Sequence, residues 1–166
     1  VHPCLVPESA PIAHVPGAFN AVVADGDYVG STVYEGRGAG GGPTASAVVA
    51  DLVDIARGLR VPTFAIAADR LAPPRPVAIS GHRGAYYICL TVRDVPGVMA
   101  DVTAIFRDEQ ISLDSMLQRG REPGESVPVV LETHECEEAA MARALKKIGR
   151  LESMLRPPRM IRIEAF

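Results

Sequence analysis

Asp94-Val95-Pro96-Gly97-Val98 marks the point where the C-terminal half of the chain changes from a strand pattern to a helix pattern. Residues 86–93 before it are rich in β-branched and aromatic side chains, which is typical of a strand. The proline and glycine within the stretch predict a tight turn. After it, apolar residues recur at helical spacing and predict one buried helix face: Val98, Val102, Ile105 and Phe106.

The chain after this helix continues the alternation of strands and helices. It predicts a strand over 111–118, a polar Gly/Pro loop over 119–125, a strand over 127–133, a helix over 137–150 and a last strand over 160–163. This βαββαβ order is the ferredoxin-like arrangement, with an antiparallel sheet and both helices on one face. Such a small unit has a marginal core, so we expect its open sheet face or an edge to meet a second copy.

A second organising stretch lies upstream, where a glycine run over residues 36–42 ends in Pro43-Thr44. Proline suits the first turn of a helix, and the apolar spacing over 45–57 predicts a helix with one buried face. Gly58 then fits a helix terminator. The loop thus leads into a helix N-terminus, whose free N–H groups suit an anion or a polar carbonyl.

Two interpretations of the glycine run remain open on the residues alone. One is a tight strand-to-helix connection with close packing. A dinucleotide fingerprint would need a following parallel strand and an acidic residue roughly 20 positions on, whereas Asp51 and Asp54 come too early. The pattern therefore favours a supporting contact to a cofactor that is held elsewhere over a phosphate cradle.

The remaining upstream segments suggest a hairpin and a linker. Residues 19–24 predict a strand, 25–27 a turn and 28–35 the second arm. The chain begins at Val1 in the middle of a strand-like pattern, so we expect an excised fragment. A proline-rich stretch predicts three divisions: residues 1–71, a linker over 72–84, and a small α/β domain over 85–166.

Composition excludes several functional classes. The chain has 166 residues, 48% apolar content and a net charge of −3, which argues against nucleic acid or an acidic membrane surface as the main partner. We also expect no membrane span and no metal site, because the histidines are scattered and no CxxC occurs. Cys4, Cys89 and Cys136 are interpreted as reduced, mostly buried thiols, which predicts a cytoplasmic protein.

These residues carry two resemblances. The Asp94-Val95-Pro96-Gly97-Val98 turn within residues 85–166 is similar to the strand-to-helix turn of ACT domains, the small-molecule-sensing modules of amino-acid enzymes. Residues 1–58 contain Asn20-Ala21-Val22, the glycine run, and 43–48 followed by Asp51-Leu52, and they resemble the end of the catalytic portion of homoserine dehydrogenase. In that order the two resemble the tail of the ACT-bearing bacterial form of that enzyme.

The resemblance implies an enzyme that passes a hydride between NAD(P) and the homoserine/aspartate-semialdehyde pair. It places the Rossmann half, the catalytic lysine and the substrate carboxylate upstream of Val1. We therefore assign no catalytic residue here, because Lys146 and Lys147 both fall on the predicted exposed face of the last helix. Gly38, Ala39 and Gly40 match the family segment that lies against the cofactor near its nicotinamide end, with helix packing as the alternative role.

For the second domain, the resemblance implies a sensing site at the first turn. The backbone N–H groups of Gly97, Val98 and Met99 could receive an α-carboxylate, and Asp94 could pair with the α-ammonium or serve only as a turn residue. Alternative ammonium partners, Asp114 and Ser115, would come from a neighbouring copy. Threonine is the effector that the family suggests, although such modules also serve simply to dimerise. The other hypothesis is a stand-alone amino-acid sensor without catalysis.

Overall fold

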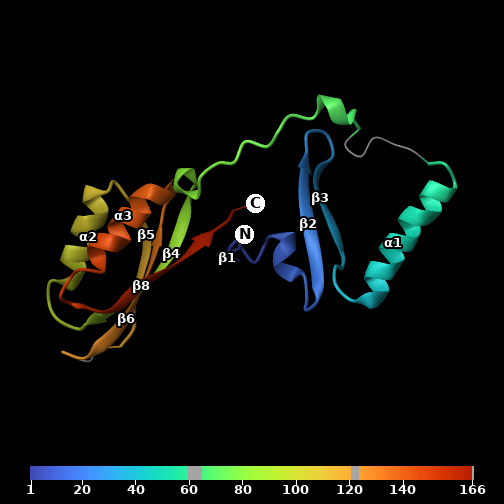
Figure 1. The fold of residues 1–166 in the computed structure, drawn as a ribbon. Coiled ribbons are helices and arrows are strands. Elements are labelled where there is room, and N and C mark those ends of the chain that lie inside the picture. Colours follow the sequence, from blue (N-terminus) through green and yellow to red (C-terminus); the bar gives the residue numbers. More distant parts are fainter. Residues whose placement is uncertain (60–64, 121–123, 166) are drawn as a thin grey trace. The chain divides into compact units, whose positions relative to one another are not determined.

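The strand β4 (Arg83–Arg93) organises the larger part of the computed structural model, which describes residues 1–59, 65–120 and 124–165. Every second side chain along β4 is buried, from Tyr86 to Val92. The helices α2 (Val98–Asp108) and α3 (Glu138–Ile148) lie together over the face that these side chains share (Figure 1). Each fully buried Ile or Leu there stabilises the fold by about 1.5–3 kcal/mol.

The sheet has the ferredoxin-like strand order that the sequence predicted. Strand β8 (Met154–Ile163), β4, β6 (Ser126–Thr133) and β5 (Leu113–Gln118) lie side by side in that order, and each neighbouring pair is antiparallel. The predicted mixed α/β fold class is thereby confirmed. The core between sheet and helices contains the fully buried side chains Tyr86, Ile88, Leu90, Val102, Phe106, Val129, Leu131, Met141 and Ile148.

The first residues of the chain join this same sheet. Strand β1 (Cys4–Leu5) pairs in parallel with the end of β8, where Cys4 lies opposite Arg162 and Leu5 opposite Ile163. Figure 1 shows the N-terminal strand beside the end of β8. A second short strand, β7 (Cys136–Glu137), pairs with the start of β4. β1 lies within the strand-like pattern noted at the start of the chain, but its pairing with β8 was not predicted, and neither was β7.

The chain divides into two compact units, and one of them is made of two separate segments of the chain. One unit contains Val1–Pro7 together with Val77–Phe166, and the other contains Glu8–Pro76. The functional boundaries at 71/72 and 84/85 stay predictions. Residues 1–7 nevertheless pack with the C-terminal unit, because β1 extends its sheet.

Strand β8 contains an irregularity beside β4. Cys89 pairs with Arg159, whereas Thr91 pairs with Arg156, so Pro157 and Pro158 together lie opposite one residue of β4. Two residues facing one is the geometry of a β-bulge. β8 is therefore bent at the proline pair.

The unit of residues 8–76 contains the predicted hairpin and helix. Strands β2 (Phe19–Gly26) and β3 (Gly30–Arg37) pair antiparallel along their full length, and the turn lies at residues 27–29. Short 3-10 turns flank these elements at Pro11–His14 and Ala68–Arg70, and another lies in the C-terminal unit at Ile79–Gly81. The short apolar stretch of residues 61–69 falls partly outside the described residues.

Helix α1 (Gly41–Ala56) follows the glycine run as predicted, and its end is well defined. Gly58 has a φ of +75°; its N–H donates to the Ile55 carbonyl, and the Leu59 N–H donates to the Asp54 carbonyl. This pair of bonds is a Schellman motif, which confirms Gly58 as the helix terminator.

The predicted buried face of α1 is wrong for this chain. No residue of the helix is buried, and Leu52 is 59% exposed and Ile55 71% exposed. The apolar spacing is that of a helix that packs against something. In the part of the chain that the structure describes, nothing covers it.

Candidate functional site

Backbone hydrogen bonds hold the turn that links β4 to α2. The Asp94 N–H donates to the Glu125 carbonyl over 2.8 Å, and the Gly124 N–H donates back to the Asp94 carbonyl over 2.9 Å. On the other side, the Arg93 N–H donates to the Ser153 carbonyl over 2.8 Å. The turn is thus fixed by two neighbouring loops, which come before β6 and β8.

Gly97 sets the start of α2. It is the N-cap residue with φ +97° and ψ −22°, a left-handed conformation that L side chains rarely adopt. A Cβ placed on it would meet no heavy atom within 4 Å, so the requirement for glycine comes from the backbone angle and not from crowding. Its carbonyl accepts the Asp101 N–H at 3.0 Å, as the first bond of the helix.

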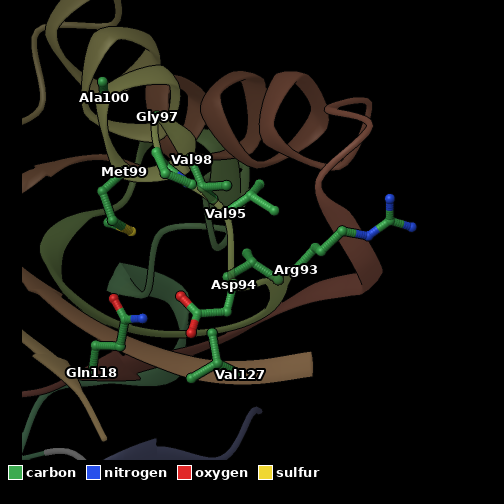
Figure 2. Close-up of a pocket in the computed structure, with 11 residues that line it drawn as sticks. Arg93, Asp94, Val95, Gly97, Val98, Met99, Ala100, Gln118 and Val127 are labelled. Atoms are coloured by element: carbon green, nitrogen blue, oxygen red, sulfur yellow. The ribbon is translucent and has the colours of Figure 1, made fainter. Parts of the chain in front are cut away.

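A cavity of about 270 Å³ opens beside this turn. The turn residues and the start of α2 form one wall, and Gln118 and Val127 come from the adjoining ends of β5 and β6. Figure 2 shows the Asp94 carboxylate and the Gln118 side chain on facing sides of the space, with Met99 reaching toward it from the helix.

The cavity combines complementary charges. The first turn of α2 points backbone N–H groups outward with the positive end of the helix dipole, while Asp94 supplies a carboxylate. The N-cap residue Gly97 has no side chain that could cap the first turn of α2. The arrangement suits a small zwitterion whose carboxylate meets the helix start and whose ammonium faces Asp94.

The structure brings Asp94, Gly97, Val98 and Met99 together at this cavity, as the sequence predicted. Their role as ligand contacts stays a prediction. Gln118 was missed by the sequence reasoning. Its signal was its place as the last residue of a strand before the Gly/Pro loop, but which strand end would adjoin the turn depends on the sheet order.

Asp114 and Ser115 lie at the opposite end of β5 from Gln118. The Ser115 hydroxyl donates to the Glu132 carboxylate over 3.0 Å, and an Asp114 oxygen lies 3.8 Å from His134 Nε2. A register shift between Leu113 and Ser115 displaces Asp114 from regular pairing. A single chain therefore does not bring these two residues to the cavity, and the predicted contact from a neighbouring copy is untested.

The glycine run connects β3 to α1 through Gly38, Ala39 and Gly40. Gly40 is the N-cap of α1 with φ +116°, and its carbonyl accepts the Thr44 N–H at 3.1 Å. A Cβ on Gly38 would lie 2.2 Å from Nδ2 of the exposed Asn20 side chain on β2, which would have to move aside. A Cβ on Gly40 would make only ordinary contact with Pro43 at 3.6 Å. The predicted cofactor contact of these residues remains a prediction.

Lys146 and Lys147 lie near the end of α3, and Lys147 is engaged in an ion-pair network. Glu109 receives Lys147 Nζ at 2.6 Å and Arg143 Nε at 2.7 Å. Hydrogen bonds from Lys147 and then Arg143 hold the pKa of Glu109 below its usual range. These ion pairs at the surface connect the end of α2 to α3.

A buried ion pair lies on the other side of α3. The Glu138 carboxylate accepts hydrogen bonds from Arg162 Nε at 2.9 Å and from the Tyr86 hydroxyl at 3.0 Å. Burial alone would raise the pKa of Glu138, but the bonds from Arg162 and Tyr86 outweigh it and lower that pKa. Burial, and then the bond to Glu138, raise the pKa of Tyr86. The cluster ties β4, α3 and β8 together.

The described residues contain no cluster of His, Cys, Asp or Glu suited to a metal ion. The three cysteines are unpaired thiols: Cys136 is buried, Cys89 half-buried and Cys4 exposed. Among the helices of the described ranges, none is both long and apolar enough to cross a bilayer.

Comparison with known proteins places both units. Residues 1–53 match the family described as homoserine dehydrogenase, and residues 86–150 match the ACT domain. The homoserine dehydrogenase of Pseudomonas aeruginosa is 40% identical over 99% of this chain, and that of Neisseria gonorrhoeae is 36% identical over all of it. A crystal structure of a homoserine dehydrogenase from Thiobacillus denitrificans superposes over 99% of the chain with a TM-score of 0.86 and 44% identity.

The coverage of these relatives is partial. The chain spans 39% of the Pseudomonas protein, 40% of the Neisseria protein and 38% of the Thiobacillus chain. A crystal structure of the Staphylococcus aureus homoserine dehydrogenase, at 21% identity and a TM-score of 0.52, shares the fold. The chain is therefore similar to a C-terminal part of homoserine dehydrogenases, and its residues 86–150 match the ACT domain.

Proposed function

We propose that this chain serves as part of an NAD(P)-dependent homoserine dehydrogenase, which interconverts L-homoserine and L-aspartate 4-semialdehyde in the biosynthesis of threonine, methionine and isoleucine. The observation that carries the proposal is the 40% identity to one such enzyme over 99% of the chain, across both units. A stand-alone ACT domain would match over residues 86–150 alone.

The exposed apolar face of α1 supports the same proposal. Most of the stability of an amphipathic helix comes from packing its apolar face against another surface, and helix propensity alone contributes little. The relatives are more than twice as long as this chain, and their additional residues supply material to cover such a face. The unit of residues 8–76 is thus expected to act as one piece of a larger catalytic region, and the chain alone is expected to be inactive.

We assign Gly38, Ala39 and Gly40 a supporting role beside the nicotinamide end of NAD(P). Gly40 holds a φ of +116°, which presents the loop backbone at the start of α1 without a side chain in the way. A valine there would both strain the backbone and add bulk toward the cofactor.

The activity test uses the full-length protein. We expect homoserine-dependent reduction of NAD(P)⁺, followed by absorbance, and loss of most of it in the Gly40→Val variant. Gly36→Val is the matched control, because Gly36 lies in β3 with open space around its Cα and no positive φ. Full-length protein without homoserine-dependent turnover would overturn the proposal.

We further propose that the cavity at the β4–α2 turn binds an amino-acid effector, with threonine as the expected ligand. A carboxylate bound by the helix N–H groups would gain on the order of 1–2 kcal/mol from the dipole and from charge-assisted bonds. Calorimetry with threonine, isoleucine, methionine and lysine on the 166-residue chain tests this. Gly97→Val is expected to abolish binding. If none of the amino acids binds at millimolar concentration, the sensing hypothesis fails and assembly is the role that is left for this domain.

The ACT domain is also expected to self-associate. Register places a set of apolar side chains on the sheet face that the helices do not cover: Leu5, Ala85, Tyr87, Cys89, Leu117, Val130, Ile161 and Ile163. Light scattering coupled to size exclusion measures the mass of the chain in solution. A monomer at micromolar concentration would contradict self-association.

A stand-alone amino-acid sensor is the second candidate, and the cavity beside Gly97 is the observation that favours it. Sequencing the natural transcript upstream of Val1 separates the two. A start codon just before Val1, with no region coding for a Rossmann fold, would favour the sensor.

A further inference from the structure

Two histidines from distant parts of the chain lie next to one carboxylate beside the sheet of β1, β8, β4, β6 and β5, which is called the ACT sheet here. His2 Nε2 lies 3.5 Å from Glu164 Oε1, and His82 Nε2 lies 3.8 Å from the same oxygen. The Glu164 backbone N–H also donates to the Leu5 carbonyl over 2.9 Å. Glu164 therefore contacts the N-terminal segment twice, through its side chain at His2 and through its backbone at Leu5 of β1.

The positions of these histidines in the chain give the cluster its significance. The unit of residues 8–76 is inserted between two segments that pack in the other unit, Val1–Pro7 and Val77–Phe166. His2 lies six positions before Glu8, and His82 lies six positions after Pro76. Six residues can span at most about 20 Å. Glu164 thus contacts both segments that lead to the inserted unit, residues 2–7 and 77–82, which are called the two connections here. Both contacted residues belong to the unit of Val1–Pro7 and Val77–Phe166, called the ACT unit, and lie six positions from its boundaries with the inserted unit.

Contacts continue from this cluster into the body of the ACT domain. The His82 carbonyl accepts the Glu138 N–H at 2.9 Å, at the first turn of α3. The Glu138 carboxylate in turn binds Arg162 and Tyr86. The two connections are therefore linked, through His82 and Glu138, to a helix and two strands of the core.

Gly84 leaves room for the His82 ring. A Cβ on Gly84 would come within 2.9 Å of His82 Nε2, so glycine at this position leaves the space that the imidazole occupies. His82 Nε2 is buried without a hydrogen-bond partner among the described residues. Burying such a polar atom is costly, and the attraction of the Glu164 carboxylate at 3.8 Å offsets part of that cost.

We propose that His2, His82 and Glu164 form an anchor that holds both connections of the inserted unit to the ACT sheet and releases them together. The anchor goes beyond the proposed enzymatic function, since it describes how the two segments that lead to the inserted unit are held at the sheet. β1 supplies only two residue pairs, so the strand is too short to stay attached without additional contacts. Loss of the Glu164 contacts frees both connections while the helix-covered core stays intact.

Hydrogen exchange with mass spectrometry on the 166-residue chain tests the anchor. In Glu164→Ala we expect exchange to rise about two- to fivefold in peptides covering 2–7 and 78–83, the size expected for partly exposed charged contacts. Peptides covering 86–92 should be unchanged. Glu152→Ala is the matched control, an exposed carboxylate before β8 that belongs to no part of the cluster.

Single histidine variants test whether the two connections are coupled. His2→Ala should speed exchange at 78–83 as well as at 2–7, and Gly84→Ala, which crowds His82, should speed exchange at 2–7 as well as at 78–83. Effects confined to the segment that carries each substitution would overturn the anchor. So would a uniform rise that includes 86–92, since that is general destabilisation.

Discussion

The ACT unit and the unit of residues 8–76 use apolar side chains at similar spacings with opposite results. In the ACT unit, apolar residues at periods of two and of three to four meet across a sheet and two helices, and Ile88, Leu90 and Phe106 are excluded from water. In the other unit, Leu52 and Ile55 follow the same helical spacing and stay exposed. Apolar periodicity therefore indicates which face is to be buried, while burial requires a partner surface within reach.

The comparison is tested most strongly by the same substitution in each unit. Leu90→Ala removes a fully buried side chain from the sheet and should lower the free energy of unfolding by about 3–5 kcal/mol. Leu52→Ala in α1 removes a side chain that is already 59% exposed and should change it by about 0.5 kcal/mol or less. Urea unfolding followed by circular dichroism measures both. Equal losses would mean that α1 packs in solution against a surface of the same chain.

The buried ion pair distinguishes the ACT unit further. Glu138→Gln leaves the Arg162 guanidinium uncompensated and should cost about 3 kcal/mol. Because the folded-state pKa of Glu138 is lowered, its contribution is fully present above the unfolded value of 4.5 and is lost as the pH falls through the folded-state pKa.

Wild-type stability should therefore fall more steeply than that of Glu138→Gln as the pH is lowered below about 4.5. Unfolding curves at a series of acidic pH values measure the slopes. Exposed Glu152→Gln is the control and should follow the wild type. Parallel slopes for wild type and Glu138→Gln would refute the assigned role.

Glycine positions separate backbone strain from side-chain packing in the two units. Gly97→Val forces a β-branched residue to a φ of +97° and should destabilise the ACT unit by about 1–2 kcal/mol. Gly36→Val introduces the same side chain into β3 without a positive φ and should be nearly neutral. Thermal unfolding compares them. A neutral Gly97→Val would show that the turn tolerates another conformation.

The smallest expected effect concerns the end of α1. Gly58→Ala places a Cβ at a φ of +75° and should weaken the Schellman motif by about 1 kcal/mol. Because nothing among the described residues packs against α1, the weakened helix end should appear as lost helicity in circular dichroism. The midpoint of thermal unfolding of the ACT unit should stay unchanged. A shift of that midpoint would indicate that the two units unfold together.

Local sequence patterns were sufficient for most of the fold. The hairpin, the helix after the glycine run and the βαββαβ order all depend on neighbours that are close in sequence, and the residues of the β4–α2 turn were recognised as a possible site. The turn chemistry of Asp94 to Gly97 is local in the same sense.

The features that were missed depend on contacts between distant residues. The strand-like pattern at the start of the chain contains β1, but its partner β8 comes from the other end of the chain, so the pairing has no local signal. Gln118 reaches the cavity only because β5 ends beside the turn. The exposure of α1 could not be predicted either, because its apolar spacing is identical whether or not a partner is present.

The bulged proline pair in β8 has a consequence for aggregation. β8 lies at the outer side of the main strands, and β1 covers it only at Arg162 and Ile163. An uncovered strand edge offers N–H and C=O groups to any other extended chain. Pro157 and Pro158 have no N–H to offer, and the bend at the bulge turns that stretch away from a straight ladder. Two parts of the β8 edge are thereby protected, Arg162 and Ile163 by β1 and the stretch at residues 157–158 by the prolines, so edge-to-edge stacking of extended chains is disfavoured there.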